Sequence, residues 1–159
     1  MILKNSNILY LFDFDGTLCG EDHWYGFFKN TYRCFLRKPY IDPSKYDIRW
    51  SIITGRPKMD YFLVKLACMW HNLTPELIYT SDDWRYKYKN NEQNYHDKLK
   101  KIFKIFEGKI KFPRKIDKIF YIDNDLECIK YINSNRTDYK IISCTVKDFY
   151  EKEFLSIPI

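Results

Sequence analysis

The sequence lacks the features that place a protein outside the cell or in a membrane. None of its five cysteines is spaced as Cys-x-x-Cys, which is the spacing of many zinc and redox sites. No apolar run approaches the roughly 18 residues of a membrane helix, and the N-terminus has no apolar segment with a cleavage site. We therefore expect neither secretion nor a membrane span, and reduced thiols in an intracellular, cytoplasmic protein.

Internal repeats and domain boundaries are also missing from the 159 residues. This length suffices for one domain with a core, and 45% apolar and 30% charged residues are typical of a globular chain. The net charge of +6 favours anionic partners. An AT-rich coding sequence, which inflates Lys, Asn, Ile and Tyr together, explains that charge equally well.

Short apolar segments alternate with longer amphipathic ones along the chain. The expected strands are Ile8–Phe12, Ile48–Ile53, Leu77–Thr80, Lys118–Ile122 and Tyr139–Ser143. The expected helices are Met59–Trp70, Tyr95–Phe106, Glu127–Asn133 and Val146–Phe154. This alternation predicts an α/β fold with a five-stranded parallel sheet in three Rossmann-like layers. A short helical insertion is expected at about residues 19–47 of this single domain, 1–159.

Two acids follow the first expected strand. Asp13 and Asp15 come directly after Ile8–Phe12, and Gly16 and Thr17 come next. Ligands of parallel α/β sheets bind at the carboxyl ends of the strands. Two carboxylates so close in a poorly solvated place repel each other, unless a cation lies between them or their chemical roles differ. Simple solvation of a turn explains the acids alone about equally well.

The second expected strand ends in groups that suit an oxyanion. Thr54, Gly55 and Arg56 follow it, and Pro57 suits the first turn of the next helix. A hydroxyl and a guanidinium at a helix N-terminus can bind a phosphate. Thr-Gly pairs are also common at such turns for conformational reasons, so this segment alone is weak evidence.

A lysine and a second acid complete the set. Lys98 lies beside the apolar face of the expected helix Tyr95–Phe106, near its start. Asp123 ends the fourth strand, as Asp13 ends the first. The chain order is therefore acid pair, Thr-Gly-Arg, lysine and acid, each at a strand end or a helix start.

This order resembles the haloacid dehalogenase-like superfamily of phosphohydrolases. Its first motif is matched by residues 13–18 (Asp-Phe-Asp-Gly-Thr-Leu), its second by Thr54, its third by Lys98 and its fourth by Asp123. The resemblance covers nearly the whole chain. Its first motif is specific and its fourth fairly so, whereas the second and third depend on order and placement.

The resemblance implies a phosphomonoester hydrolase that forms an aspartyl-phosphate. Asp13 would be the nucleophile, and Asp15 would protonate the leaving oxygen and later activate water. Thr54 would donate a hydrogen bond to a phosphoryl oxygen, and Lys98 would neutralise charge between the phosphate and Asp13. The candidate substrate-binding residues are Gly16, Thr17, Gly55 and Arg56.

The same resemblance implies Mg²⁺, which keeps several waters and needs few protein ligands. Those ligands would be the Asp13 side chain, the Asp15 backbone carbonyl and Asp123. The common fourth motif has its acids adjacent or four residues apart, and this chain departs from both spacings. Asp125 or Glu127 could therefore hold a metal-bound water, and the sequence leaves that choice open.

The third-motif lysine and the substrate are also open. Lys98 fits best because it opens an amphipathic helix, with Lys89 and Lys100 as alternatives. The interval between Asp13 and Thr54 is too short for a large cap, so we expect a small or absent cap and an open cleft. Such a cleft suits a large substrate.

The aromatic stretch 21–36 and the Thr-Gly-Arg-Pro turn resemble the small group of this superfamily with predicted RNA-repair roles. They also resemble the 3′-phosphatase domain of polynucleotide kinase-phosphatases. A phosphorylated RNA or DNA end is therefore the expected substrate, and the Lys-rich segment Lys98–Lys118 is compatible with that, although simple solvation explains it as well. The alternatives are a phosphatase of nucleotides or small metabolites, and an inactive binding module with the same fold.

Overall fold

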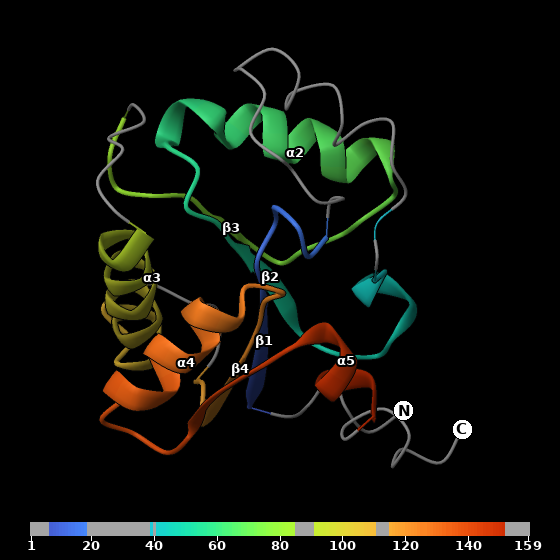
Figure 1. Ribbon diagram of the computed structural model, residues 1–159. Coiled ribbons are helices and arrows are strands. Elements are labelled where there is room, and N and C mark those ends of the chain that lie inside the picture. Colours follow the sequence, from blue (N-terminus) through green and yellow to red (C-terminus); the bar gives the residue numbers. More distant parts are fainter. Residues whose placement is uncertain (1–6, 19–38, 40, 85–90, 111–114, 152–159) are drawn as a thin grey trace.

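The structure is a computed structural model that describes residues 7–18, 39, 41–84, 91–110 and 115–151. Its centre is a five-stranded parallel sheet in the order β3-β2-β1-β4-β5 (Figure 1). The strands are β1 (Ile8–Phe12), β2 (Trp50–Ile53), β3 (Ile78–Tyr79), β4 (Lys118–Ile122) and β5 (Ile141–Cys144). The expected α/β class and the parallel five-stranded sheet are confirmed.

Helices cover both faces of the sheet. They are α2 (Tyr61–Trp70), α3 (Asn91–Phe106), α4 (Leu126–Asn135) and α5 (Val146–Phe149), with 3-10 turns η1 (Pro43–Lys45) and η2 (Lys58–Asp60). One apolar cluster joins α3 and α4 to the sheet, and the other joins α2 and α5 to its opposite face. Figure 1 shows α3 and α4 next to each other, away from α2 and α5. The result is a three-layer sandwich.

Side-chain alternation along β1 supplies both layers. Leu9 and Leu11 pack toward α3 and α4, whereas Tyr10 and Phe12 pack toward α2 and α5. A parallel sheet that is covered on both sides needs such apolar side chains on each face. Tyr10 also stacks on Phe120 of β4, with ring centroids 5.2 Å apart, which adds an aromatic pair to the central strand contact.

The strand order reverses between β1 and β4. The chain leaves β1 toward β2 on one side and leaves β4 toward β5 on the other. Ligands of open α/β sheets bind at such a switch point, beyond the carboxyl ends of the strands. The N–H of Asp13 donates to the carbonyl of Ile122 at 2.9 Å, and that of Asp123 to the carbonyl of Cys144 at 3.2 Å. The two acids therefore follow adjacent strands at this edge.

The helix α2 turns a different side to the core than its sequence pattern suggests. Its large apolar residues at helical spacing predict an inward stripe, yet Phe62, Met69 and Trp70 are exposed. The buried side of the helix consists of Val64, Ala67 and Cys68. Smaller side chains let the helix lie closer to the sheet, and that contact decides which side is buried.

Two further expectations concern the start of the helix α3 and the segment 19–47. The polar segment up to Asn94 reads as a loop, but α3 already begins at Asn91. Residues 19–38, most of the expected insertion, lie outside the described residues, and η1 forms within its end. Across the described ranges, every helix is too short or too polar to cross a bilayer.

Candidate active site

One ammonium joins two buried carboxylates at the switch point. Lys98 Nζ lies 2.8 Å from Asp13 Oδ1 and 3.2 Å from Asp123 Oδ2. The three residues are 8%, 5% and 1% exposed, in the same order. A buried ion pair needs such direct contacts, because water does not screen or solvate its charges. The structure thus brings together residues that are widely separated in sequence.

The sequence explains why these side chains meet. Asp13 continues the face of Leu11 in β1, and both belong to the side that α3 covers. Lys98 precedes Leu99, whose side chain is buried in the same layer. Of the two alternative lysines, Lys100 is exposed. The other, Lys89, lies within residues 85–90, which are outside the described residues. Lys98 is therefore the lysine that the fold brings to Asp13.

A tyrosine that the motifs do not contain completes this cluster. The Tyr121 hydroxyl accepts a hydrogen bond from Lys98 Nζ at 3.1 Å and donates one to Asp123 Oδ2. An ammonium has three donors, and here Asp13, Tyr121 and Asp123 receive them. Tyr121 lies two residues before Asp123 on β4, so the period of the strand points both to one face. That spacing is the signal that identifies it.

With both carboxylates ionised, the cluster would hold more negative than positive charge. Burial, together with the charges of Asp123 and Asp15, raises the pKa of Asp13 to about 8 against the lowering effect of Lys98. Burial alone would lower the pKa of Lys98, but Asp13 and Asp123 hold it well above its ordinary value. Lys98 therefore stays charged and compensates one carboxylate, whereas Asp13 ionises only near pH 8 unless a further cation lies beside it.

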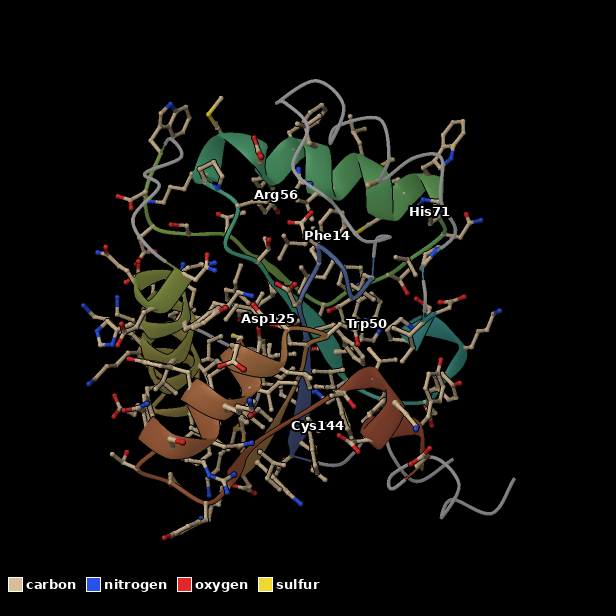
Figure 2. The ribbon with its side chains drawn as sticks, viewed as in Figure 1. Phe14, Trp50, Arg56, His71, Asp125 and Cys144 are labelled. Carbon is tan, nitrogen blue, oxygen red and sulfur yellow. The ribbon has the colours of Figure 1, made fainter. Side chains whose placement is uncertain are left out.

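Arg56 forms an ion pair with Asp15, the second acid after β1. Its Nε lies 2.8 Å from Asp15 Oδ2 and its Nη2 lies 2.6 Å from Asp15 Oδ1, a bidentate pair. Its Nη1 lies 3.6 Å from Asp60 Oδ2, and its guanidinium carbon lies 5.5 Å from the Phe14 ring centre. Figure 2 shows Arg56 near Phe14, between α2 and the loop after β1. The guanidinium is buried and directed at Asp15, a partner that its expected role in substrate binding did not include.

The backbone after β2 leaves the Thr54 hydroxyl able to donate. The Arg56 N–H donates to Thr54 Oγ at 3.2 Å, so that oxygen already acts as an acceptor. No acceptor among the described residues takes its hydrogen. Gly55 lies against α3, since a Cβ there would come within 2.5 Å of Asn94 Oδ1.

Asn124 connects the loop that follows β1 with the loop that follows β4. Its side-chain nitrogen donates to the carbonyl of Gly16 at 2.6 Å, and its backbone N–H donates to Thr17 Oγ at 3.1 Å. Gly16 has φ +74°, a left-handed conformation that favours glycine. Thr17 is fully buried. Its hydroxyl fixes the loop after β1 to the loop after β4, and with it the separation of Asp13 and Asp123.

The structure gives Asp125 and Glu127 partners away from the cluster. Asp125 Oδ1 accepts from the backbone N–H groups of Glu127 and Cys128 and caps α4, and Oδ2 accepts from the Tyr95 hydroxyl at 2.8 Å. Glu127 is exposed and pairs with Lys130 at 2.8 Å. Figure 2 shows Asp125 at the start of α4. Neither side chain needs a metal to satisfy its oxygens.

The residues at the edge of β1 and β4 fit a divalent cation. Asp13 and Asp123 share one ammonium, and Asp13 Oδ2 receives no hydrogen bond from the described residues. When Asp13 is ionised, this leaves one uncompensated negative charge and an available carboxylate oxygen, which is the kind of donor that Mg²⁺ prefers. Within the described ranges, no three His, Cys, Asp or Glu side chains form a complete metal cage. A hydrated ion that uses two carboxylates and a backbone carbonyl does not require one.

Comparison with known proteins gives no match. No protein-family model fits the sequence, and neither a curated protein nor a solved structure is significantly similar to it. The function is therefore argued from the residues and their geometry.

Proposed function

We propose that this protein is a Mg²⁺-dependent phosphomonoester hydrolase of the haloacid dehalogenase-like type, acting through an aspartyl-phosphate. The observation that carries the proposal is the buried Asp13–Lys98–Asp123 cluster at the switch point. Phosphoryl transfer needs a nucleophile, positive charge and a proton donor in one place. Asp13 and Lys98 are in direct contact, and Asp15 follows Asp13 by two residues in the same loop.

The chain's own residues would carry two half-reactions. The Asp13 carboxylate attacks phosphorus, the ester P–O bond breaks, and Asp15 gives its proton to the departing oxygen. Asp15 then takes a proton from water, whose oxygen attacks the aspartyl-phosphate and releases phosphate and free Asp13. The bidentate contact with Arg56 suits the carboxylate form of Asp15, which is the form that activates water.

The remaining groups would bind and orient the phosphate. Lys98 and the Thr54 hydroxyl would face the phosphoryl oxygens. Mg²⁺ would be held by the Asp13 and Asp123 side chains and the Asp15 carbonyl, and its charge would offset that of the phosphate.

Hydrolysis of p-nitrophenyl phosphate tests this function. We expect turnover with MgCl₂ and its loss with excess EDTA, restored by added Mg²⁺. Folded protein that hydrolyses no phosphomonoester in a broad panel would contradict the proposal and favour the alternative of an inactive binding module.

A substitution of Arg56 separates positioning of Asp15 from binding of substrate. Arg56→Lys keeps the charge but loses the planar, bidentate contact. We expect kcat to fall by about ten- to a hundredfold, with little change in KM, because Asp15 loses its fixed orientation. Steady-state kinetics with p-nitrophenyl phosphate measure both constants. A rise in KM with kcat unchanged would instead support direct contact with the substrate phosphate.

The proposed substrate is a phosphorylated nucleic-acid end. The net charge of +6 and the short interval between Asp13 and Thr54 support it. Nucleotides or small phosphorylated metabolites are the second candidate, which a polar cavity of about 280 Å³ beside Thr54 favours. The ratio of kcat/KM for a 3′-phosphorylated oligonucleotide to that for free nucleotides decides between them. Binding of the oligonucleotide should also weaken steeply with salt if several lysines contact its backbone.

A further inference from the structure

The Tyr121 hydroxyl lies among the groups of the candidate active site, and the proposed reaction gives it no role. The side chain is fully buried, and its ring packs in the apolar layer that includes α3 and α4. The hydroxyl contacts Lys98 Nζ at 3.1 Å, Cys128 Sγ at 3.7 Å and Asp123 Oδ2. One partner would satisfy a buried tyrosine hydroxyl, so contact with both an ammonium and a carboxylate is more than packing requires.

The direction of each hydrogen bond follows from the groups that carry a hydrogen. Lys98 is an ammonium and only donates. Burial raises the pKa of the Cys128 thiol to about 12, so the sulfur keeps its hydrogen and can donate as well. Burial and the charges of Asp123 and Asp13 raise the pKa of Tyr121 well above its ordinary value, so the hydroxyl also keeps its hydrogen. The hydroxyl therefore accepts from its two neighbours and donates to Asp123.

All three hydrogens of the Lys98 ammonium are engaged in this arrangement. They go to Asp13 at 2.8 Å, to Tyr121 at 3.1 Å and to Asp123 at 3.2 Å. In the proposed reaction Lys98 faces a phosphoryl oxygen, so it has to give up one of these contacts. The contact with Asp123 is the longest of the three and is the one that the ammonium can release most easily.

The Asp123 carboxylate keeps a hydrogen bond on each oxygen when Lys98 leaves it. Oδ2 still accepts from the Tyr121 hydroxyl, and Oδ1 accepts from the backbone N–H of Asp125 at 2.9 Å. Without the hydroxyl, Oδ2 would depend on Lys98 alone. Because a buried carboxylate oxygen without a donor is costly, the ammonium would then be held at Asp123 and kept from the phosphate.

We propose that Tyr121 is a positioning residue whose hydroxyl holds Asp123 and thereby allows Lys98 to turn to the phosphate. The inference rests on the proposed function, because it assumes that the phosphate lies beside Asp13. Tyr121 acts on the phosphate through Lys98, so its effect has to disappear when the ammonium is absent. That dependence distinguishes it from a residue that only packs in the core.

A double-mutant cycle with orthovanadate tests this dependence. Vanadate resembles the transition state of phosphoryl transfer, and such mimics bind tightly enough to be measured on weakened variants. In calorimetry with MgCl₂, we expect Tyr121→Phe, which keeps the ring, to bind vanadate about tenfold more weakly than wild type. In the Lys98→Met background, the same substitution should change the affinity by less than about twofold.

Kinetics and a matched control accompany the cycle. The kcat/KM of Tyr121→Phe for p-nitrophenyl phosphate should fall by the same factor as its vanadate affinity, because both depend on Lys98 reaching the transition state. The control is Tyr79→Phe, since Tyr79 is partly buried in the same layer and its hydroxyl has no hydrogen-bond partner among the described residues. This control should leave vanadate affinity and kcat/KM unchanged.

The outcomes separate the inference from the proposed function. Unchanged vanadate affinity in Tyr121→Phe, or an equal loss with and without Lys98, would overturn the role of Tyr121. Wild-type protein that binds no vanadate would overturn it as well. Wild-type protein that binds vanadate but hydrolyses no phosphomonoester would overturn the proposed function alone, since the cycle measures binding and not turnover.

Proton NMR of the wild-type protein decides the same point if a variant does not fold. The Tyr121 hydroxyl hydrogen is buried and bonded to a carboxylate, so we expect a downfield signal, assigned in protein with isotope-labelled tyrosine. This signal should persist and move further downfield when vanadate binds, because Tyr121 is then the only side-chain donor to Asp123 Oδ2. Its absence with vanadate bound would show that the hydroxyl does not hold Asp123 and would overturn the inference.

Discussion

Asp13→Asn is expected to lower kcat for p-nitrophenyl phosphate by at least about a thousandfold while the protein stays folded. The amide of Asn is a poor nucleophile, and no described residue beside it offers a second carboxylate in the same position. The substitution keeps the size of the side chain. It also removes one of two carboxylates that compete for Lys98, so the free energy of unfolding should stay equal or rise.

The two readouts together identify the role of Asp13. Wild-type protein quenched in acid during turnover of radiolabelled substrate should carry covalent phosphate, and the Asp13→Asn protein should not. Asp117→Asn is the matched control, because that acid is exposed and pairs with Lys115 far from the cluster. A variant that retains labelled phosphate, or more than about a tenth of wild-type kcat, would show that the nucleophile is another group.

The positions of Asp13, Asp123 and Lys98 could be predicted from the pattern of apolar residues in the sequence. An acid directly after an apolar run lies at a strand end, and parallel strands bring those ends to one edge. Asp13 and Asp123 follow this rule. Lys98 was predictable for a similar reason: it borders the apolar face of a helix that has to pack on the same sheet. These residues depend on local pattern and on fold class, which a sequence carries directly.

Contacts that depend on loop conformation were not predictable in this way. The contact of Arg56 with Asp15 was not predicted, because it depends on the turn after β2, which directs the guanidinium to the loop after β1. Asn124 fixes Gly16 through a long-range hydrogen bond that no period encodes. Such contacts require the relative positions of two loops, and those follow from the packing of the whole domain.

The side of α2 that faces the sheet shows a further limit of pattern. Hydrophobic spacing identifies an amphipathic helix correctly, but it weighs large and small apolar residues by hydropathy alone. Close packing on a sheet favours the side of Val64, Ala67 and Cys68, and the larger Phe62 and Trp70 remain outside. Shape therefore decides the orientation where two faces of a helix are both apolar.

Lys98→Met is expected to reduce both stability and activity. Methionine fills a similar volume without charge, so the variant leaves Asp13 and Asp123 buried without their ammonium. Loss of one partner of a buried ion pair costs about 3–5 kcal/mol, and we expect the free energy of unfolding in urea to fall by about 3 kcal/mol or more. Hydrolysis should fall at least about a hundredfold, because positive charge near the phosphoryl oxygens is lost.

Mg²⁺ then distinguishes a cation site from a simple packing defect. If Asp13 and Asp123 hold a divalent ion, added MgCl₂ should raise the stability of Lys98→Met more than that of the wild-type protein, because the ion replaces the missing positive charge. Activity should not return, since Lys98 also faces the phosphate in the proposed reaction. Lys100→Met is the matched control on the exposed side of α3 and should leave stability and its Mg²⁺ dependence unchanged. An equal response of Lys98→Met and wild type to Mg²⁺ would argue that these two carboxylates do not share a metal ion, even if both variants fold.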